Sequence, residues 1–219
     1  MFIDRRDAGI QLAKRLKKYR GQKDILVLAL PRGGMVTAFE IAKSLGAPID
    51  VLIVRKIGFP GQPELAVGAV SETGTVALNQ SIVSMYGVSE DYIQKETLRQ
   101  KEEISRRVKL YRKGKTISGL DDKTIILVDD GVATGATVKA AIMTLKKEKI
   151  ARLILALPVG PRDTADELKE MVDEFICIET VEDFYAVGAH YADFTQVSDE
   201  EVVAMLERSA AGQKGDTDG

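Results

Sequence analysis

The sequence predicts an α/β fold with a mostly parallel five-stranded sheet flanked by helices. Five short apolar runs alternate along the chain with segments of helical periodicity, and this alternation favours parallel strands joined by right-handed crossovers. Two of the runs end in glycine-containing loops that lead directly into a helix. A strand order of 2-1-3-4-5 would place those loops side by side at the carboxyl edge of the sheet, where open sheets of this kind bind ligands.

The first part of the chain begins this alternation. Asp4 is placed to cap a first helix, and residues 25–30 form the first apolar strand. That strand ends in a loop with Arg32, Gly33 and Gly34, after which a second helix follows. A cation on a glycine loop suits a bound anion. Taken alone, however, this loop is explained equally well as a plain strand–helix turn with a surface arginine.

The next apolar run, residues 49–54, is interpreted as the second strand and ends in Arg55 and Lys56. Two cations at the end of a strand indicate a further contribution to an anion site. The alternative is that both side chains are simply solvated, which is usual for lysine and arginine.

Residues 57–115 depart from the alternation. Glycine and proline residues between 58 and 63 break regular structure, and residues 65–78 predict a β-hairpin. A long helix then runs from Ser89 to about Arg112, and its middle is almost wholly polar. A charged run of this kind is most often a solvated helix face.

The second half of the chain returns to the alternation. Three further strands are predicted, at residues 125–128, 151–159 and 175–178. Ser198 and Glu201 form a capping box that opens a last short helix. Residues 209–219 are small and polar, so we expect them to form a disordered tail.

The stretch from Thr124 to Thr137, TIILVDDGVATGAT, joins a strand, two carboxylates and a loop of small residues at a helix N-terminus. Backbone amides and the helix dipole make such a loop a cradle for phosphate. A Walker A loop would need a lysine before its Ser/Thr, and the dinucleotide fingerprint is also missing. A simple strand–helix turn leaves the repelling charges of Asp129 and Asp130 unexplained. The Thr-Gly loop directly after them argues against an aspartate phosphoacceptor.

The segment VDDGVATGAT resembles the signature with which type I phosphoribosyltransferases bind phosphoribosyl pyrophosphate (PRPP). The resemblance implies that Asp129 and Asp130 hold the ribose hydroxyls and, through water, Mg²⁺, and that they are catalytic together with Arg32. The loop for the 5′-phosphate would comprise Gly131, Val132, Ala133, Thr134, Gly135, Ala136 and Thr137. The pyrophosphate would be bound by Arg32, Gly33 and Gly34, with Arg55 and Lys56 nearby.

The same resemblance implies a division of the chain. Residues 1–208 would form a single phosphoribosyltransferase domain, in which residues 57–115 are a flap that closes over PRPP. Residues 180–208, together with the N-terminal segment, would form a hood that holds the acceptor. Enzymes of this type often carry a non-proline cis peptide before the glycines of the pyrophosphate loop, which here is the bond between Pro31 and Arg32. We also expect a homodimer.

We therefore expect a pentosyltransferase of nucleotide metabolism that moves the 5-phosphoribosyl group of PRPP to a nitrogenous acceptor, a nucleobase, and releases pyrophosphate. The motifs RKIG at 55–58 and PELAVGAVSE at 63–72 are similar to a branch of the family whose acceptor is not settled. His190, the only histidine, lies in the hood segment, where a packed or surface role is more common than acid–base catalysis. The alternative function is a non-catalytic module that binds PRPP or a nucleotide and regulates a partner.

Composition bounds the other classes of function. The 219 residues are 45% hydrophobic and 29% charged, which suits one domain with a full-sized core. A net charge of −2 gives no basic field for nucleic acid or a membrane surface, and no apolar run approaches the ~20 residues of a membrane span. The single cysteine, Cys177, cannot support a disulfide framework. The charged N-terminus is unlike a signal peptide, so we expect a cytoplasmic protein.

Overall fold

The main sheet of the computed structural model is parallel and has the strand order β2-β1-β6-β7-β8, which confirms the predicted 2-1-3-4-5 order. The structure describes the backbone of residues 1–215, and the side chains of all these except residues 63–64 and 211–215. The five strands are β1 (Ile25–Ala29), β2 (Ile49–Val51), β6 (Thr124–Val128), β7 (Arg152–Pro161) and β8 (Glu174–Val181).

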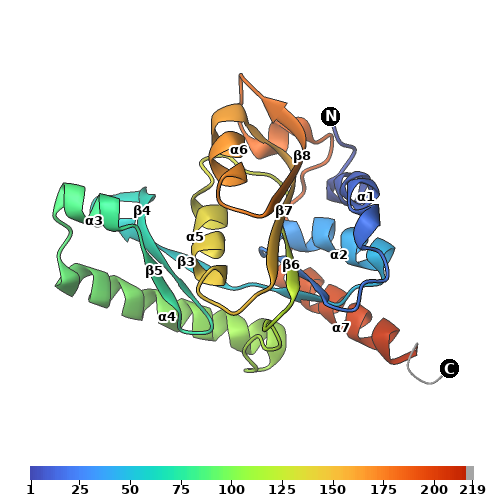
Figure 1. Cartoon of the computed structure of the whole chain (residues 1–219), viewed down its shortest axis with the longest axis horizontal. Helices are drawn as coiled ribbons and strands as arrows, with labels where there is room; N and C mark the ends of the chain where they lie inside the picture. Colours follow the sequence, from blue (N-terminus) through green and yellow to red (C-terminus); the bar gives the residue numbers. More distant parts are fainter. Residues whose placement is uncertain (216–219) are drawn as a thin grey trace.

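Helices cover both faces of this sheet, so the core has three layers (Figure 1). One face carries α1 (Arg5–Arg15), α2 (Gly33–Leu45) and α7 (Asp199–Gly215), and the other carries α5 (Ala136–Leu145) and α6 (Arg162–Lys169). Alternate residues of the strands point to opposite faces. Ile126 and Val128 therefore pack in the first cluster, whereas Ile125 and Leu127 pack in the second. Two short 3₁₀ helices, η1 (Lys17–Tyr19) and η2 (Val187–His190), lie between the larger elements.

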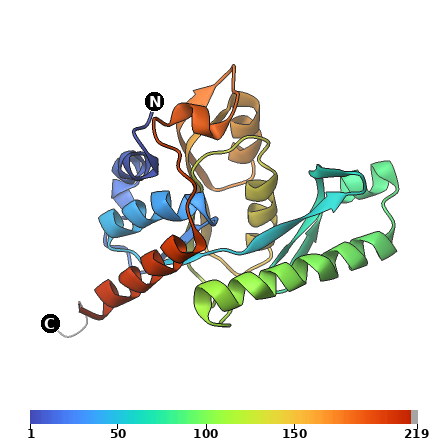
Figure 2. The same cartoon turned by 180° about the vertical axis from the view of Figure 1, so that it is seen from behind.

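A second, antiparallel sheet and two helices project from the core as an arm, defined here as residues 54–112 (Figures 1 and 2). The sheet has the order β3-β4-β5, with β3 (Val54–Phe59), β4 (Gln62–Ser71) and β5 (Val76–Leu78). The helices are α3 (Gln80–Tyr86) and α4 (Glu90–Arg112). The side chain of Ser89 caps α4 through the amide of Tyr92, so the predicted start of the long helix is confirmed.

The arm corrects two predictions. The expected second strand, residues 49–54, is divided, because β2 ends at Val51 and β3 begins at Val54 in the other sheet. The stretch from 58 to 63 is not irregular, because Pro60 and Gly61 form the turn between β3 and β4. Proline and glycine are compatible with pairing when they fall in the turn of a hairpin rather than within its ladder. Arg55 and Lys56 consequently lie within β3, not at the end of a core strand.

The C-terminal helix also differs from expectation. The capping box is present, since the amide of Ser198 donates to Glu201 (2.7 Å) and the amide of Glu201 donates to Ser198 (3.2 Å). The helix continues to Gly215, well into the expected tail of residues 209–219. Ala210 and Ala211 favour helix, so the helix continues beyond the last apolar residues that have helical spacing. The expected tail at 216–219 lies outside the described residues.

Across residues 1–215, none of the helices combines the length and the apolar character needed to cross a membrane.

Candidate active site

Two loops meet at the carboxyl edge of the main sheet. β1 and β6 are parallel neighbours with Ala29 opposite Val128, and the amide of Leu30 donates to the carbonyl of Val128 at 2.9 Å. The glycine loop that follows β1 and the acidic pair that follows β6 therefore lie side by side. This is the juxtaposition expected at the switch point of an open α/β sheet.

The glycines of the first loop allow it to approach the acidic pair closely. A Cβ at Gly34 would lie 2.9 Å from the Cα of Asp129, and a Cβ at Gly33 would collide with Oδ2 of Asp130. Side chains at these two positions would force the loops apart. The peptide bond between Pro31 and Arg32 is cis, as the resemblance implied, and Arg32 stands at the N-cap of α2.

The two aspartates occupy different environments. Oδ1 of Asp129 accepts the amide of Asp130 at 2.9 Å. Burial, and secondarily the negative charge of Asp130, raise the pKa of Asp129 well above its usual range. Asp130 instead forms an ion pair, in which its Oδ2 accepts from Nε of Arg5 at 2.6 Å. The pair thus combines one carboxyl that resists ionisation with one that a cation stabilises.

Arg5 is one of the residues at this edge that the sequence analysis did not identify. It starts α1, and its side chain is only 10% exposed. Besides Asp130 it donates to the carbonyl of Thr195 at 2.8 Å, and its guanidinium carbon lies 3.7 Å from the centroid of the Phe194 ring. A signal was available, because Arg5 precedes Leu12 by seven residues and so lies on the buried stripe of α1.

The small-residue loop after the acidic pair leads into α5. Its Gly135 has a φ of 73°, a left-handed conformation that suits glycine, and serves as the N-cap. Thr134 Oγ1 accepts the amide of Ala136 at 3.4 Å, while Gly135 has no side chain with which to cap the next amides. Thr164 Oγ1 donates to the carbonyl of Ala133 at 2.9 Å and holds the loop from α6. The loop therefore presents first-turn amides of a helix at the sheet edge, where an anion can bind them.

A cavity of about 260 Å³ joins the cations of the arm to both loops. It is lined by Pro31 of the first loop, Thr137 of the second, and Arg55, Lys56 and Arg107 of the arm, together with Leu30, Leu52, Ile53 and Val54. Arg55 donates to Oε1 of Gln100 at 2.9 Å, and burial, followed by the charge of Arg107, lowers its pKa. The structure thus brings Arg55 and Lys56 to the predicted edge, although from β3, and adds Arg107.

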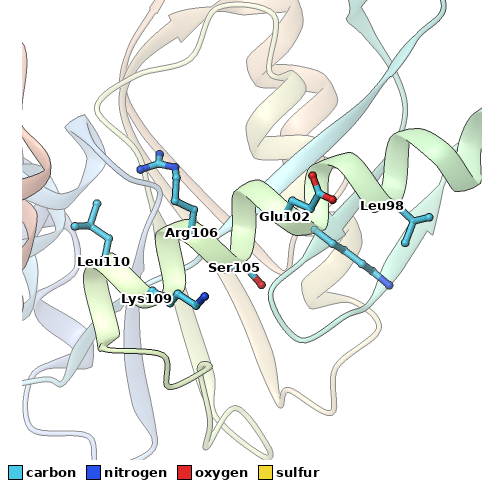
Figure 3. A pocket seen from close by; sticks show the side chains of 7 residues that line it. Leu98, Glu102, Ser105, Arg106, Lys109 and Leu110 are labelled. Carbon is cyan, nitrogen blue, oxygen red and sulfur yellow. The ribbon is translucent and has the colours of Figure 1, made fainter.

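A larger hollow of about 860 Å³ lies elsewhere (Figure 3). Leu98, Glu102, Ser105 and the other residues that line it all belong to α4. Because one helix supplies the whole lining, this is an open surface rather than an enclosed site.

His190 makes its contacts away from the acidic pair and the glycine loop. Its ring stacks on Phe184, and its Nδ1 lies 3.8 Å from the Glu179 carboxylate.

The acidic pair fits a metal only in part. No cluster of three or more His, Cys, Asp or Glu side chains able to hold an ion occurs among the described residues. Two adjacent carboxylates are nevertheless the donors that Mg²⁺ uses when it keeps several waters and is bound chiefly by substrate phosphates. Asp129 and Asp130 therefore suit an ion that arrives with its substrate, bound through water, rather than one held in a protein cage.

Comparisons with known proteins agree with this geometry. The model of the phosphoribosyl transferase domain matches residues 5–194, which contain both loops. A Mycobacterium tuberculosis protein named "Putative phosphoribosyl transferase", from strains CDC 1551 and H37Rv, is 46% identical over 211 residues, covering 95% of this chain and 47% of the relative. This chain thus spans about half the length of these curated relatives. The crystal structure of TT1426 from Thermus thermophilus matches with a TM-score of 0.86 and 40% identity, over 94% of this chain and 98% of that one. The chain belongs to the phosphoribosyl transferase domain family.

Proposed function

We propose that this domain transfers the 5-phosphoribosyl group of PRPP to a nitrogenous acceptor, a nucleobase, and releases pyrophosphate. One observation carries the proposal: the glycine loop after β1 contacts the acidic pair after β6, with Gly34 against the Cα of Asp129. An anion-binding loop and two carboxylates at one sheet edge match a substrate that has phosphates at both ends and hydroxyls between them.

The two loops divide the substrate between them. Asp129 and Asp130 accept hydrogen bonds from the ribose hydroxyls, and residues 131–137 bind the 5′-phosphate with the first-turn amides of α5. Arg32, Gly33 and Gly34 bind the pyrophosphate. Arg55 and Lys56 line the neighbouring cavity, where they add positive charge for the same group.

The reaction breaks the bond between C1 of the ribose and the pyrophosphate oxygen, which keeps the electron pair. The acceptor nitrogen donates its lone pair to C1 and loses a proton. Negative charge therefore develops on the leaving group while positive charge develops on the ring. Arg32, Arg55 and Lys56 stabilise the first, while Asp129 and Asp130 orient the ribose and tolerate the second. Mg²⁺, when bound with PRPP, supplies further positive charge to the pyrophosphate.

The remaining parts of the chain complete the site in this proposal. The arm acts as the flap over PRPP, because its β3 already lines the cavity at the sheet edge. The segment around Phe194 and Thr195, with the N-terminal residues, acts as the acceptor-side hood, because Arg5 joins it to Asp130. The active form is a cytoplasmic homodimer.

The test is to incubate the protein with PRPP, Mg²⁺ and a panel of nucleobases and to follow pyrophosphate release. Turnover with one base identifies the acceptor. Asp129→Asn should lose this turnover, whereas Asp121→Asn, at an exposed position before β6, should keep it. PRPP binding without turnover for any base would favour the regulatory module. Failure to bind PRPP in calorimetry would overturn the proposal.

A further inference from the structure

We propose that Arg5 is a positioning residue that holds the N-terminal segment and the segment before α7 against Asp130, so that the acceptor side of the site and the ribose-binding carboxylate move as one unit. The inference rests on the proposed function for the role of Asp130. The attachment of the two segments to Asp130 depends only on contacts seen in the structure. These contacts join four parts of the chain: α1, the acidic pair, the glycine loop and the segment before α7.

The N-terminal segment and the segment before α7 form one hydrogen-bonded structure, the terminal junction, defined here as residues 2–5 and 190–195. The amide of Phe2 donates to the carbonyl of His190 at 2.8 Å, the amide of Ala192 donates to Phe2 at 2.8 Å, and the amide of Asp193 donates to Ile3 at 2.9 Å. The rings of Phe2 and Phe194 both pack on Tyr191, with centroid separations of 5.3 and 5.0 Å. The junction is therefore a small sheet-like unit with its own aromatic core.

Two contacts attach this junction to the acidic pair. Tyr191 donates its hydroxyl to the carbonyl of Asp130 at 2.5 Å, which fixes the backbone. Arg5 fixes the side chain, since one guanidinium edge reaches Oδ2 of Asp130 while another reaches the carbonyl of Thr195. The same guanidinium lies over the ring of Phe194. An arginine can make these three contacts together because its planar fork has several donors and a flat face, whereas a lysine ammonium cannot.

The position of the ion pair gives it a functional consequence. It engages Oδ2 of Asp130, which leaves Oδ1 as the oxygen that can accept from a ribose hydroxyl. Nε of Arg5 lies 2.9 Å from the place where a Cβ of Gly33 would stand, so the ion pair lies directly on the glycine loop. A movement of the junction would therefore turn the Asp130 carboxylate and disturb the loop for pyrophosphate. Arg5 acts through Asp130 and needs no contact with the acceptor.

Arg6 provides a matched control. It is the next residue in α1 and also pairs with a carboxylate, Glu40, at 2.9 Å, but its side chain is 65% exposed. Arg5→Gln and Arg6→Gln remove the same charge from the same helix. The only intended difference is whether the ion pair reaches the acidic pair.

The first measurement needs no substrate. Hydrogen exchange of the amides of Phe2, Ala192 and Asp193 should accelerate at least about tenfold in Arg5→Gln and stay unchanged in Arg6→Gln. Asp130→Asn should accelerate the same amides, because it breaks the same ion pair from the other side. If Arg5→Gln does not fold, exchange in Asp130→Asn and in the doubly neutral Arg5→Gln/Asp130→Asn variant gives the answer. Unchanged exchange would overturn the fastening role.

The second measurement is PRPP affinity by calorimetry. Arg5→Gln should weaken binding by about 10- to 100-fold, the usual effect of losing a residue that orients a ligand-binding group. Arg6→Gln should stay within about twofold, and Arg5→Lys should recover part of the loss. In the Asp130→Asn background Arg5→Gln should add little, because both changes break one interaction. A full additional loss there would mean that Arg5 contacts the substrate directly, and would overturn the positioning role. If the wild type does not bind PRPP but the exchange result holds, the proposed function fails and the fastening stands.

Discussion

Two arginine–carboxylate pairs in this molecule are similarly buried but differ in how many oxygens of the carboxylate accept hydrogen bonds. Arg5 and Asp130 lie at the sheet edge, with side chains 10% and 15% exposed. Arg112 and Glu72 lie at the base of the arm, with side chains 11% and 0% exposed. At the base, both oxygens of the carboxylate are used. Oε1 of Glu72 accepts the amide of Ile53 at 3.0 Å, and Oε2 accepts from Arg112 and from the amide of Ile117 at 2.9 Å.

This difference in the use of the carboxylate oxygens distinguishes a pair with a structural role from a pair at the candidate active site. Glu72, which lies between β4 and β5, binds both places where the chain passes between core and arm, namely the entry at Ile53 and the exit at Arg112 and Ile117. Arg112 also reaches Asp50 of β2 at 3.1 Å. In the pair at the sheet edge, Arg5 engages Oδ2 of Asp130, which also lies against Gly33 of the glycine loop, and Oδ1 is left without a hydrogen bond among the described residues. Burial alone does not distinguish a site, but an incompletely used carboxylate beside a glycine loop does.

The largest effect that tests this contrast is on stability at the base of the arm. Glu72→Ala removes the acceptor of two buried amides and one of the two carboxylate partners of buried Arg112, which should lower the free energy of unfolding by about 3–5 kcal/mol. Urea unfolding followed by circular dichroism measures this loss. Glu148→Ala is the control, because Glu148 accepts from the hydroxyls of Thr73 and Thr75 nearer the surface and should cost about 1 kcal/mol or less. Equal losses of unfolding free energy in the two variants would show that Glu72 does not contribute more than a surface carboxylate to holding the arm on the core.

The acidic pair should respond in the opposite way. Asp129→Asn should weaken PRPP binding by about 1.5–3 kcal/mol, roughly 10- to 150-fold, because it replaces one oxygen that accepts a substrate hydroxyl with an amide NH₂ that can only donate. The variant should nevertheless be at least as stable as the wild type at pH 7. Burial and the charge of Asp130 raise the folded-state pKa of Asp129. A raised carboxyl pKa favours folding fully only below the unfolded value of 3.8, and this contribution is lost as the pH rises through the folded-state pKa.

Calorimetry with PRPP and urea unfolding at pH 7 measure these two quantities on the same protein. A large loss of stability in Asp129→Asn would place this carboxylate with Glu72 as a structural group. Unchanged affinity for PRPP would remove it from the proposed site.

The fold and the acidic loop of the candidate site follow from local sequence patterns, whereas the long-range contacts that attach other segments to them do not. The run 124–137 predicted both the strand and the loop, because its apolar segment, paired carboxylates and glycines are contiguous. The strand order also followed, since alternating strands and helices allow few parallel topologies. The contact between Arg5 and Asp130 spans 125 positions, and only its place on the buried stripe of α1 hinted at it. The division of the second strand was missed because pairing of β3 with β4 is a tertiary choice that the apolar run 49–54 does not record.

The smallest effect belongs to a third arginine–carboxylate group, in the second half of α4. Glu103 accepts from Arg106 and Arg107 at 2.8–2.9 Å, and these hydrogen bonds lower its pKa to about 2. Its side chain is 30% exposed, so water and salt screen the attraction. Glu103→Gln should therefore cost less than about 1 kcal/mol at pH 7, far below the loss expected for Glu72→Ala.

The pH dependence gives this last prediction its sign. Because the folded-state pKa of Glu103 is lowered, its stabilising contribution is present above the unfolded value of 4.5 and disappears as the pH falls toward about 2. The difference in unfolding free energy between wild type and Glu103→Gln should therefore shrink over this interval, and added salt should reduce it at pH 7. Urea unfolding at several pH values and two salt concentrations measures both trends. A difference as large as that of Glu72→Ala, or one insensitive to salt, would mean that exposure does not govern the strength of these pairs. The contrast between Glu72, whose two oxygens are both hydrogen-bonded in a buried position, and the less fully bonded carboxylates would then lose its physical basis.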